Sequence, residues 1–208
     1  LLYTWPLAQG LGSVTNRFPV QNGILHVVGN EGGGIFSTNR YRDYVQVFEF
    51  KWGPRQWGAG EWAAKNTGLL LHSRGYEGGH DNRNMPGLEV QLAEGSAGDF
   101  LLEMGTNQSG QQLSMSMLGT IGNVTCTGGN WNCRGGHRWV AGGTQAFFDE
   151  LYDTIHWYAW DPGWEDVTGY RGAVDFESTD GQWNQVVTEV VGGRVSVFLN
   201  GTKVNEIL

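Results

Sequence analysis

The stretch MPGLEVQL, residues 85–92, contains a Pro-Gly turn followed by a strict alternation of apolar and polar side chains. Successive side chains of a β-strand point to opposite faces, so this period of two predicts a half-buried strand. The polar face carries Glu89 and Gln91, and it either meets bulk water or lines a pocket. The apolar face consists of Leu88, Val90 and Leu92.

The same period recurs along the chain, whereas no window carries a 3.6-residue apolar stripe with helix caps. These strands predict an all-β fold, with two antiparallel sheets packed face to face in a jelly-roll sandwich. Gly192 and Gly193 predict a tight hairpin between the last two strands. The strands are expected at residues 23–29, 44–52, 67–74, 87–92, 99–105, 111–117, 154–160, 183–191 and 194–201.

The length of 208 residues suits a single sandwich domain over residues 1–208, without an internal repeat or a dividing linker. The Gly-rich segment 118–150 lacks clean alternation and is predicted to run over one rim as a long excursion.

A net charge of -8 without any block of Lys or Arg argues against a nucleic-acid partner. No stretch approaches the roughly 20 apolar residues of a membrane span, and the chain starts without Met or a leader, so we expect a mature soluble domain.

The two cysteines of the chain, Cys126 and Cys133, lie in the segment CTGGNWNC. This spacing could close a small disulfide loop over the two glycines. Free thiols are an alternative, as is a metal site with His137, although structural zinc usually has four protein ligands. A disulfide would indicate a secreted or periplasmic protein.

Two of the predicted strands carry polar side chains that could share one sheet face. Alternation along residues 67–74 places His72 and Arg74 on one strand face. If this strand pairs with residues 87–92, that face coincides with the face of Glu89 and Gln91. The alternative is that these residues lie on a solvated outer sheet.

Several aromatic residues suit stacking on sugars, because their rings present apolar faces to the C–H side of a sugar. They are Trp57, Trp62, Tyr76, Trp131 and Trp160. The loop that follows residue 76 is rich in polar groups and is read as a solvated loop, with a cation site or a substrate role as alternatives. Its polar residues are Glu77, His80, Asp81, Asn82 and Asn84.

A conventional glycosidase needs two carboxyl groups that face each other across the scissile bond. Glu89 could be one of them, and Glu94 has the wrong strand parity to be the other. The remaining candidates are Asp99, Glu103, Asp149 and Glu150. The sequence contains no GxSxG elbow and no HExxH helix.

Taken in order, six segments resemble the 3-keto-disaccharide hydrolase domain family, which has a concanavalin A-like sandwich. Departures from its pattern are Thr67 in place of Ser, Tyr44 in place of Phe, and Ala93-Glu94 in place of a frequent Asp. The segments are VQNGIL (20–25), STNRYRDYVQVFEFKW (37–52), NTGLLLHSR (66–74), PGLEVQL (86–92), GQWNQVV (181–187) and VFLNGTKV (197–204).

The resemblance implies a carbohydrate substrate oxidised at C3, and a pocket that contains four motif residues. A ketone at C3 acidifies C2–H, so a base can remove that proton, an acid can assist departure of the C1 substituent, and water can then add. The motif residues are Asn66, Arg74, Glu89 and Gln91. Strand parity adds His72 to this set, and the neighbouring loops add His80, Tyr76 and Trp62 as substrate-binding candidates.

We expect Glu89 to act as general base or acid, and Arg74 and His72 to polarise the ketone or protonate the leaving group. Gln91 and Asn66 would bind hydroxyl groups. No cofactor is indicated with certainty, although a divalent cation could take the part of Arg74 as Lewis acid. The alternatives to an enzyme are a non-catalytic carbohydrate-binding, lectin-like domain and a structural or adhesion domain.

Overall fold

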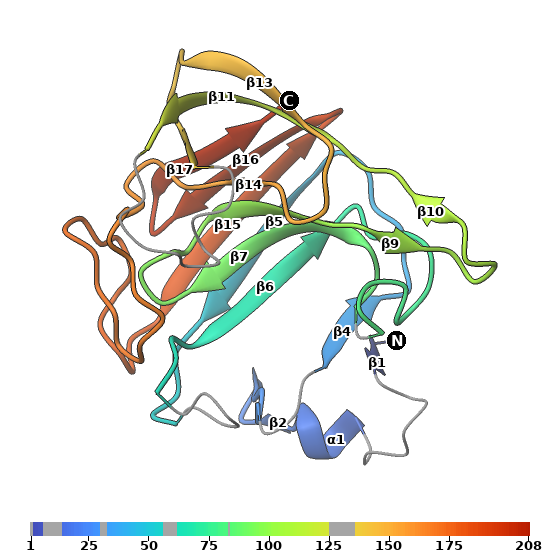
Figure 1. Cartoon of the computed structure of the whole chain (residues 1–208). Coiled ribbons are helices and arrows are strands. Elements are labelled where there is room, and N and C mark those ends of the chain that lie inside the picture. The colour runs from blue at the N-terminus through green and yellow to red at the C-terminus, as the bar shows by residue number, and fades with distance from the viewer. Residues whose placement is uncertain (1, 6–13, 30–32, 56–61, 83, 125–135) are drawn as a thin grey trace.

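The computed structural model describes residues 2–5, 14–29, 33–55, 62–82, 84–124 and 136–208 (Figure 1). The all-β class is confirmed, and within these residues the only helix is the short α1 (Val14–Arg17). The proposed disulfide of Cys126 and Cys133 and the stacking candidates Trp57 and Trp131 lie outside the described residues.

The larger of the two main sheets has seven strands. They are β5 (Tyr44–Phe50), β11 (Met117–Asn123), β12 (His137–Trp139), β13 (Thr144–Phe148), β15 (Asn184–Val191), β16 (Arg194–Leu199) and β17 (Thr202–Ile207). Their order is β12-β11-β17-β16-β15-β5, and β13 also pairs with β11.

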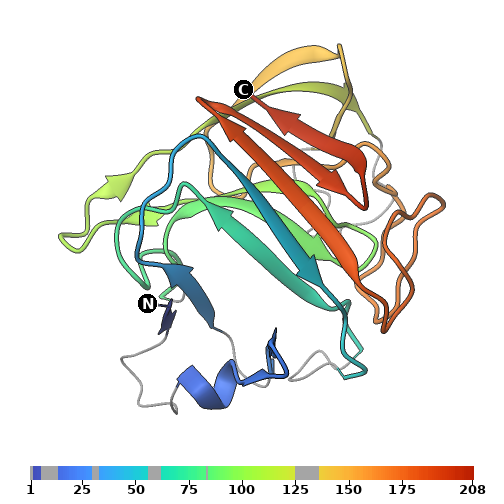
Figure 2. The same ribbon diagram turned by 180° about the vertical axis from the view of Figure 1, so that it is seen from behind.

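The second main sheet has four strands, in the order β14-β8-β7-β6. These strands are β6 (Asn66–Leu71), β7 (Gly87–Ala93), β8 (Asp99–Glu103) and β14 (Thr154–Ile155). In Figure 1 this sheet lies in front of the seven-stranded sheet, and Figure 2 shows the same two layers from behind. All strand pairings within both sheets are antiparallel.

Three two-stranded sheets complete the described part of the chain: β1 with β4, β2 with β3, and β9 with β10. Their strands are β1 (Leu2–Trp5), β2 (Val20–Gln21), β3 (Ile24–Leu25), β4 (Gly34–Ser37), β9 (Gly105–Thr106) and β10 (Gln112–Leu113). The N-terminal elements lie below the two main sheets in both views.

The hydrophobic core lies between the two main sheets, and β7 supplies part of it. Leu88, Val90 and Leu92 are all buried, as the alternation predicts, and they join one cluster with Val197 and Leu199 of the facing sheet. Full burial of each such side chain contributes about 1.5–3 kcal/mol to folding. The polar residues of β7 therefore point away from the core, to the outer face of the four-stranded sheet.

The predicted hairpin at Gly192 and Gly193 is confirmed. β15 and β16 pair antiparallel up to Val191 and Arg194, which leaves a two-residue loop. Gly192 has a φ of 61°, a backbone conformation that favours glycine. Its N–H donates to the Asp43 carboxylate.

The interpretation of residues 118–150 as an excursion over one rim is wrong for the described residues, because β11, β12 and β13 belong to the seven-stranded sheet. Glycines conceal the strand pattern of β11 by replacing side chains that would have alternated. A Cβ at Gly119 would lie 2.5 Å from Cδ1 of Ile155, in the facing sheet. Close packing between the layers therefore accounts for this glycine.

Several predicted strands are shorter in the structure than in the sequence interpretation. The strand expected at 154–160 ends at Ile155, and the one expected at 23–29 is reduced to Ile24–Leu25. Both expected ends are replaced by turns or irregular backbone, where side chains no longer alternate between two faces. The alternation of aromatic residues after Ile155 instead reflects buried loop residues such as Trp157 and Trp160.

Candidate active site

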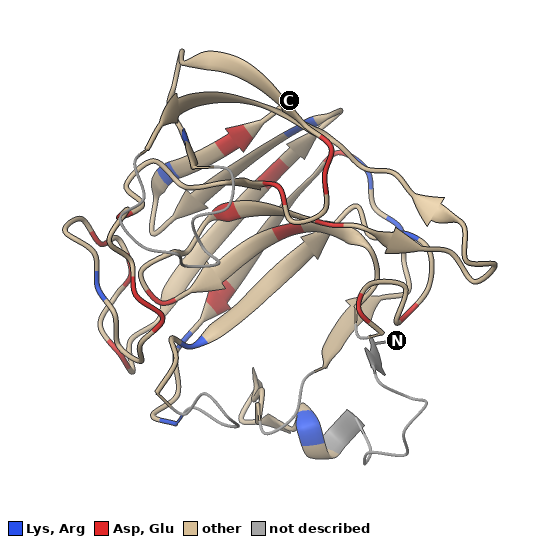
Figure 3. Cartoon of the chain, viewed as in Figure 1, with Lys and Arg blue, Asp and Glu red and all other residues tan. Residues whose placement is uncertain are grey.

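The outer face of the four-stranded sheet carries a group of polar side chains fixed by strand register. Glu89 lies opposite Leu70 of β6 and Leu101 of β8. Gln91 lies opposite Gly68 and Asp99 in the next row. Glu89 and Gln91 therefore lie on the outer face, and the predicted pairing of β6 with β7 is confirmed. Figure 3 shows acidic and no basic positions along β7 and β8.

The side chain of Glu89 lies across the backbone of the neighbouring strand. A Cβ at Gly68 would lie 1.8 Å from Glu89 Oε1 and 2.7 Å from its Cγ. Since no side chain fits there, glycine in the segment NTG leaves the space that Glu89 occupies.

Gln91 links Glu89 to Asn66 when its amide nitrogen is oriented toward the carboxyl group. In that orientation the nitrogen donates to the two Glu89 oxygens at 3.0 and 3.2 Å, and the oxygen accepts from Asn66 Nδ2 at 3.0 Å. The structure thus brings together three of the predicted site residues, Glu89, Gln91 and Asn66.

A second carboxyl group, Glu103, shares the outer face with Glu89. Glu103 lies opposite Gly87, two residues along the same strand pair, and the two carboxyl groups share a hydrogen bond. Burial away from water and the adjacent negative charge of Glu103 raise the pKa of Glu89 well above its ordinary value. Burial also raises the pKa of Glu103.

The two carboxyl groups of this pair have different neighbours. The pKa of Glu103 is raised by burial, but His80, the hydrogen bond with Glu89 and the amide of Asn84 all act to lower it. The pKa of each acid is raised, and the two acids titrate as a coupled pair. Such a pair offers one base and one acid at the same place.

His80 and Asn84 reach Glu103 from the loop between β6 and β7. Asn84 Nδ2 donates to Glu103 Oε2 at 3.4 Å, and His80 Nε2 lies 3.7 Å from Glu103 Oε1. Backbone hydrogen bonds between His80 and Asn84 hold this loop in place. His80, a predicted substrate-binding residue, thus lies beside the carboxyl pair.

His72 and Arg74 do not occupy the expected sheet face. The strand expected to run to residue 74 ends at Leu71, and His72 has a φ of 52°, so the alternation of side chains stops there. Both residues are exposed. The expectation that they share a face with Glu89 is wrong, and their catalytic roles remain predictions without that support.

The three aromatic candidates that fall in the described part of the chain differ in their surroundings. Trp62 is 65% exposed, and its carbonyl accepts a hydrogen bond from the Thr168 backbone at 2.6 Å, just before the start of β6. Tyr76 is partly buried in the loop that also carries His80. Trp160 is buried, so it offers no free face for a sugar.

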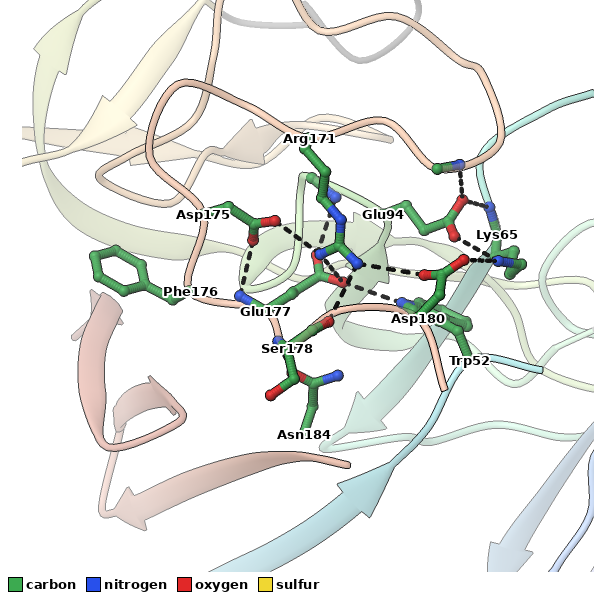
Figure 4. A network of polar contacts seen from close by, with 12 residues as sticks. Trp52, Lys65, Glu94, Arg171, Asp175, Phe176, Glu177, Ser178, Asp180 and Asn184 are labelled. Carbon is green, nitrogen blue, oxygen red and sulfur yellow. Dashed lines mark hydrogen bonds and ion pairs between the residues drawn. The ribbon is translucent and has the colours of Figure 1, made fainter. Parts of the chain in front are cut away.

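Glu94, at the end of β7, belongs to a different network (Figure 4). It is fully buried and accepts hydrogen bonds from the Lys65 ammonium at 2.8 Å and from the backbone N–H groups of Lys65 and Gly169. Nearby, Arg171 pairs with Asp175 and Asp180. This network fixes the loop between β14 and β15 against the end of the sheet.

Glu103 was one of four possible carboxyl partners in the sequence, and only the structure singles it out. It lies on the same strand face as Asp99 and Leu101 by the period-two rule, but its position next to Glu89 depends on the register of β7 with β8.

Among the described residues, no group of three or more His, Cys, Asp or Glu is arranged to hold a metal ion. Nor does any helix there have the length and apolarity needed to cross a membrane.

A family model of the 3-keto-alpha-glucoside-1,2-lyase-like domain matches residues 4–208. The chain belongs to this family. The resemblance inferred from the six segments is thereby confirmed, and this lyase-like domain family is named for an activity on 3-keto-alpha-glucosides. Searches of curated proteins and of solved structures found no match to the chain.

Proposed function

We propose that the protein is a carbohydrate-active enzyme that acts on 3-keto-glycosides by removing the C2 proton and eliminating the substituent at C1. The carboxyl pair of Glu89 and Glu103 is the observation that carries this proposal. The pair lies on an outer sheet face, Glu89 is partly exposed, and its pKa is raised well above the ordinary value by burial and by Glu103. Perturbed carboxyl groups of this kind are frequent at catalytic sites.

The chemistry uses one ionised and one protonated carboxyl group. The ionised member, for which Glu103 is better suited, takes the proton from C2. The electron pair of the broken C–H bond forms a C1=C2 double bond as the C1–O bond breaks. Glu89 gives its proton to the departing oxygen, and water can then add across the double bond to complete a net hydrolysis.

The remaining polar groups of the site are suited to binding and orienting the sugar. Gln91 and Asn66 form one edge of the carboxyl pair and can hydrogen-bond to hydroxyl groups. Trp62 offers an exposed ring close to the start of β6 for stacking on a sugar.

A concanavalin A-like jelly roll and a secreted or periplasmic location belong to the same proposal. The face-to-face arrangement of the two main sheets and the family match support the first. The spacing of Cys126 and Cys133 supports the second.

The decisive experiment measures turnover of 3-keto-glucosides and of ordinary disaccharides by the wild type, Glu89→Gln and Glu103→Gln. We expect turnover of the 3-keto substrates only, and a loss of about 10²- to 10⁴-fold in each variant. Glu189→Gln is the matched control, because Glu189 is an exposed carboxylate on β15. Each glutamine variant should remain folded, because it removes one of two adjacent acids.

The second candidate is a non-catalytic carbohydrate-binding domain, which the exposed ring of Trp62 favours. Sugar binding without turnover of either substrate class, unchanged in Glu89→Gln and lost in Trp62→Ala, would support this alternative and contradict the enzyme.

A further inference from the structure

A line of polar groups leads from the carboxyl pair to the surface. Its first step joins Glu103 Oε1 to His80 Nε2 over 3.7 Å. His80 Nε2 lies 3.5 Å from the Tyr152 hydroxyl and 3.6 Å from Asp81 Oδ2. The Tyr152 hydroxyl in turn donates to Asp81 Oδ2 at 2.5 Å. The line ends in water, since the Asp81 side chain is 60% exposed.

The imidazole of His80 is held in a defined tautomer and orientation. Its Nδ1 lies 2.6 Å from the carbonyl oxygen of Met104, so Nδ1 carries the hydrogen and donates it. In the neutral ring, Nε2 is therefore the atom able to accept a proton. The side chain is only 4% exposed, so Nε2 contacts the protein groups around it and not bulk water.

Three groups beside His80 bear on proton transfer. Glu103 comes from β8, Tyr152 comes from the turn before β14, and Asp81 is the next residue in the loop. The aromatic ring of Tyr152 meets the imidazole edge to face, with ring centroids 5.5 Å apart. Asp81 adopts a φ of 48°, a left-handed conformation that the loop maintains.

We propose that His80, together with Tyr152 and Asp81, is a proton relay that connects the carboxyl pair to bulk water. This inference rests on the proposed function. In each turnover the pair takes one proton from C2 and gives one to the departing oxygen, so the net proton count is zero. The elimination leaves the proton on Glu103 and leaves Glu89 ionised. The relay resets the two acids: Glu103 passes its proton to His80 Nε2, Nε2–H passes it to Asp81 and on to water, and Glu89 takes one proton from water. The Tyr152 hydroxyl holds the Asp81 carboxylate in place by its hydrogen bond.

A purely structural role for His80 predicts a different behaviour. In that case its loss would change stability and substrate binding, and no small molecule in solution would repair the rate. A relay predicts that a soluble proton carrier can replace it. Imidazole is the matching probe, because it has the same titrating group.

The test compares wild type, His80→Ala, Asp81→Asn and Tyr152→Phe in steady-state assays on a 3-keto-glucoside with increasing imidazole. We expect kcat of His80→Ala to fall about 10- to 100-fold with KM nearly unchanged, and imidazole to restore it saturably. His26→Ala, which removes an exposed histidine, should leave the rate unchanged. The release into water of deuterium placed at C2 should slow in parallel with kcat.

Two failures are distinguishable. A wild type that turns over no 3-keto-glucoside would overturn the proposed function and the relay with it. An active wild type whose His80→Ala variant keeps its rate, or loses it without rescue by imidazole, would overturn the relay alone. If His80→Ala does not fold, Asp81→Asn and Tyr152→Phe decide the matter, because the relay requires both to show imidazole-dependent rates.

Discussion

β7 carries one glutamate on its outer face and another directly after its end, and their surroundings are opposite. Glu94 is matched by the Lys65 ammonium and by two backbone N–H groups. Glu89 instead faces a second carboxyl group, Glu103, and the amide of Gln91. Among the described residues, no Lys or Arg forms an ion pair with either member of that pair.

The difference separates a structural acid from one suited to exchange protons. A buried carboxylate with a cation and several donors is stable in one protonation state, so it holds the chain in place. Two adjacent carboxyl groups cannot both ionise cheaply, so a proton moves between them. The same residue type therefore anchors a loop at one end of β7 and supports chemistry within the strand.

The largest expected effect tests the anchoring role of Glu94. Lys65→Met leaves a fully buried carboxylate without its cation, and should lower the free energy of unfolding by about 3–5 kcal/mol. Urea denaturation measures the loss. The double variant Lys65→Met/Glu94→Leu should recover part of it, because no uncompensated charge is left. If the single variant is as stable as the wild type, the contrast between the two glutamates fails.

A second effect concerns Glu177, an acid of the same loop network. Burial raises its pKa from 4.5 to about 7, although it accepts hydrogen bonds from the Trp52 indole and the Gly95 N–H. The folded protein therefore binds more protons than the unfolded chain between these values. The stability contributed by protonated Glu177 is complete below about pH 4.5 and is lost as pH rises through about 7.

The measurement is the difference in unfolding free energy between the wild type and Glu177→Gln, followed from pH 4.5 to 8. We expect the wild type to lose about 3 kcal/mol relative to the variant over this interval. Glu189→Gln, which removes an exposed carboxylate on β15, is the control for the substitution itself. A flat curve for Glu177→Gln would show that its hydrogen bonds outweigh its burial.

The smallest expected effect on stability comes from a substitution beside Glu89, the glutamate within β7. Gly68→Ala places a methyl group in the space of the Glu89 carboxyl, which must rotate away. We expect kcat to fall at least about tenfold, and the free energy of unfolding to fall by at most about 3 kcal/mol. Gly53→Ala is the control, because a Cβ there meets no atom within 4 Å. Equal activity in both variants would mean that the position of Glu89 does not matter.

Strand periodicity made the local part of the site predictable. The alternation in GLEVQL places Glu89 and Gln91 opposite the core residues, and the structure agrees. The same rule failed at His72, because nothing in the sequence TGLLLHSR marks the left-handed residue that ends the strand at Leu71. It also failed for residues 117–123, where Gly119 and Gly122 interrupt the pattern.

By itself the sequence determined the all-β class, the two faces of β7 and the family, because these depend on side-chain order along one strand and on motifs in one chain. Only the tertiary structure decided which acid meets Glu89. That choice depends on the register between β7 and β8 and on a loop that brings His80 to Glu103. Register and loop path are set by contacts between distant segments, which no local period records.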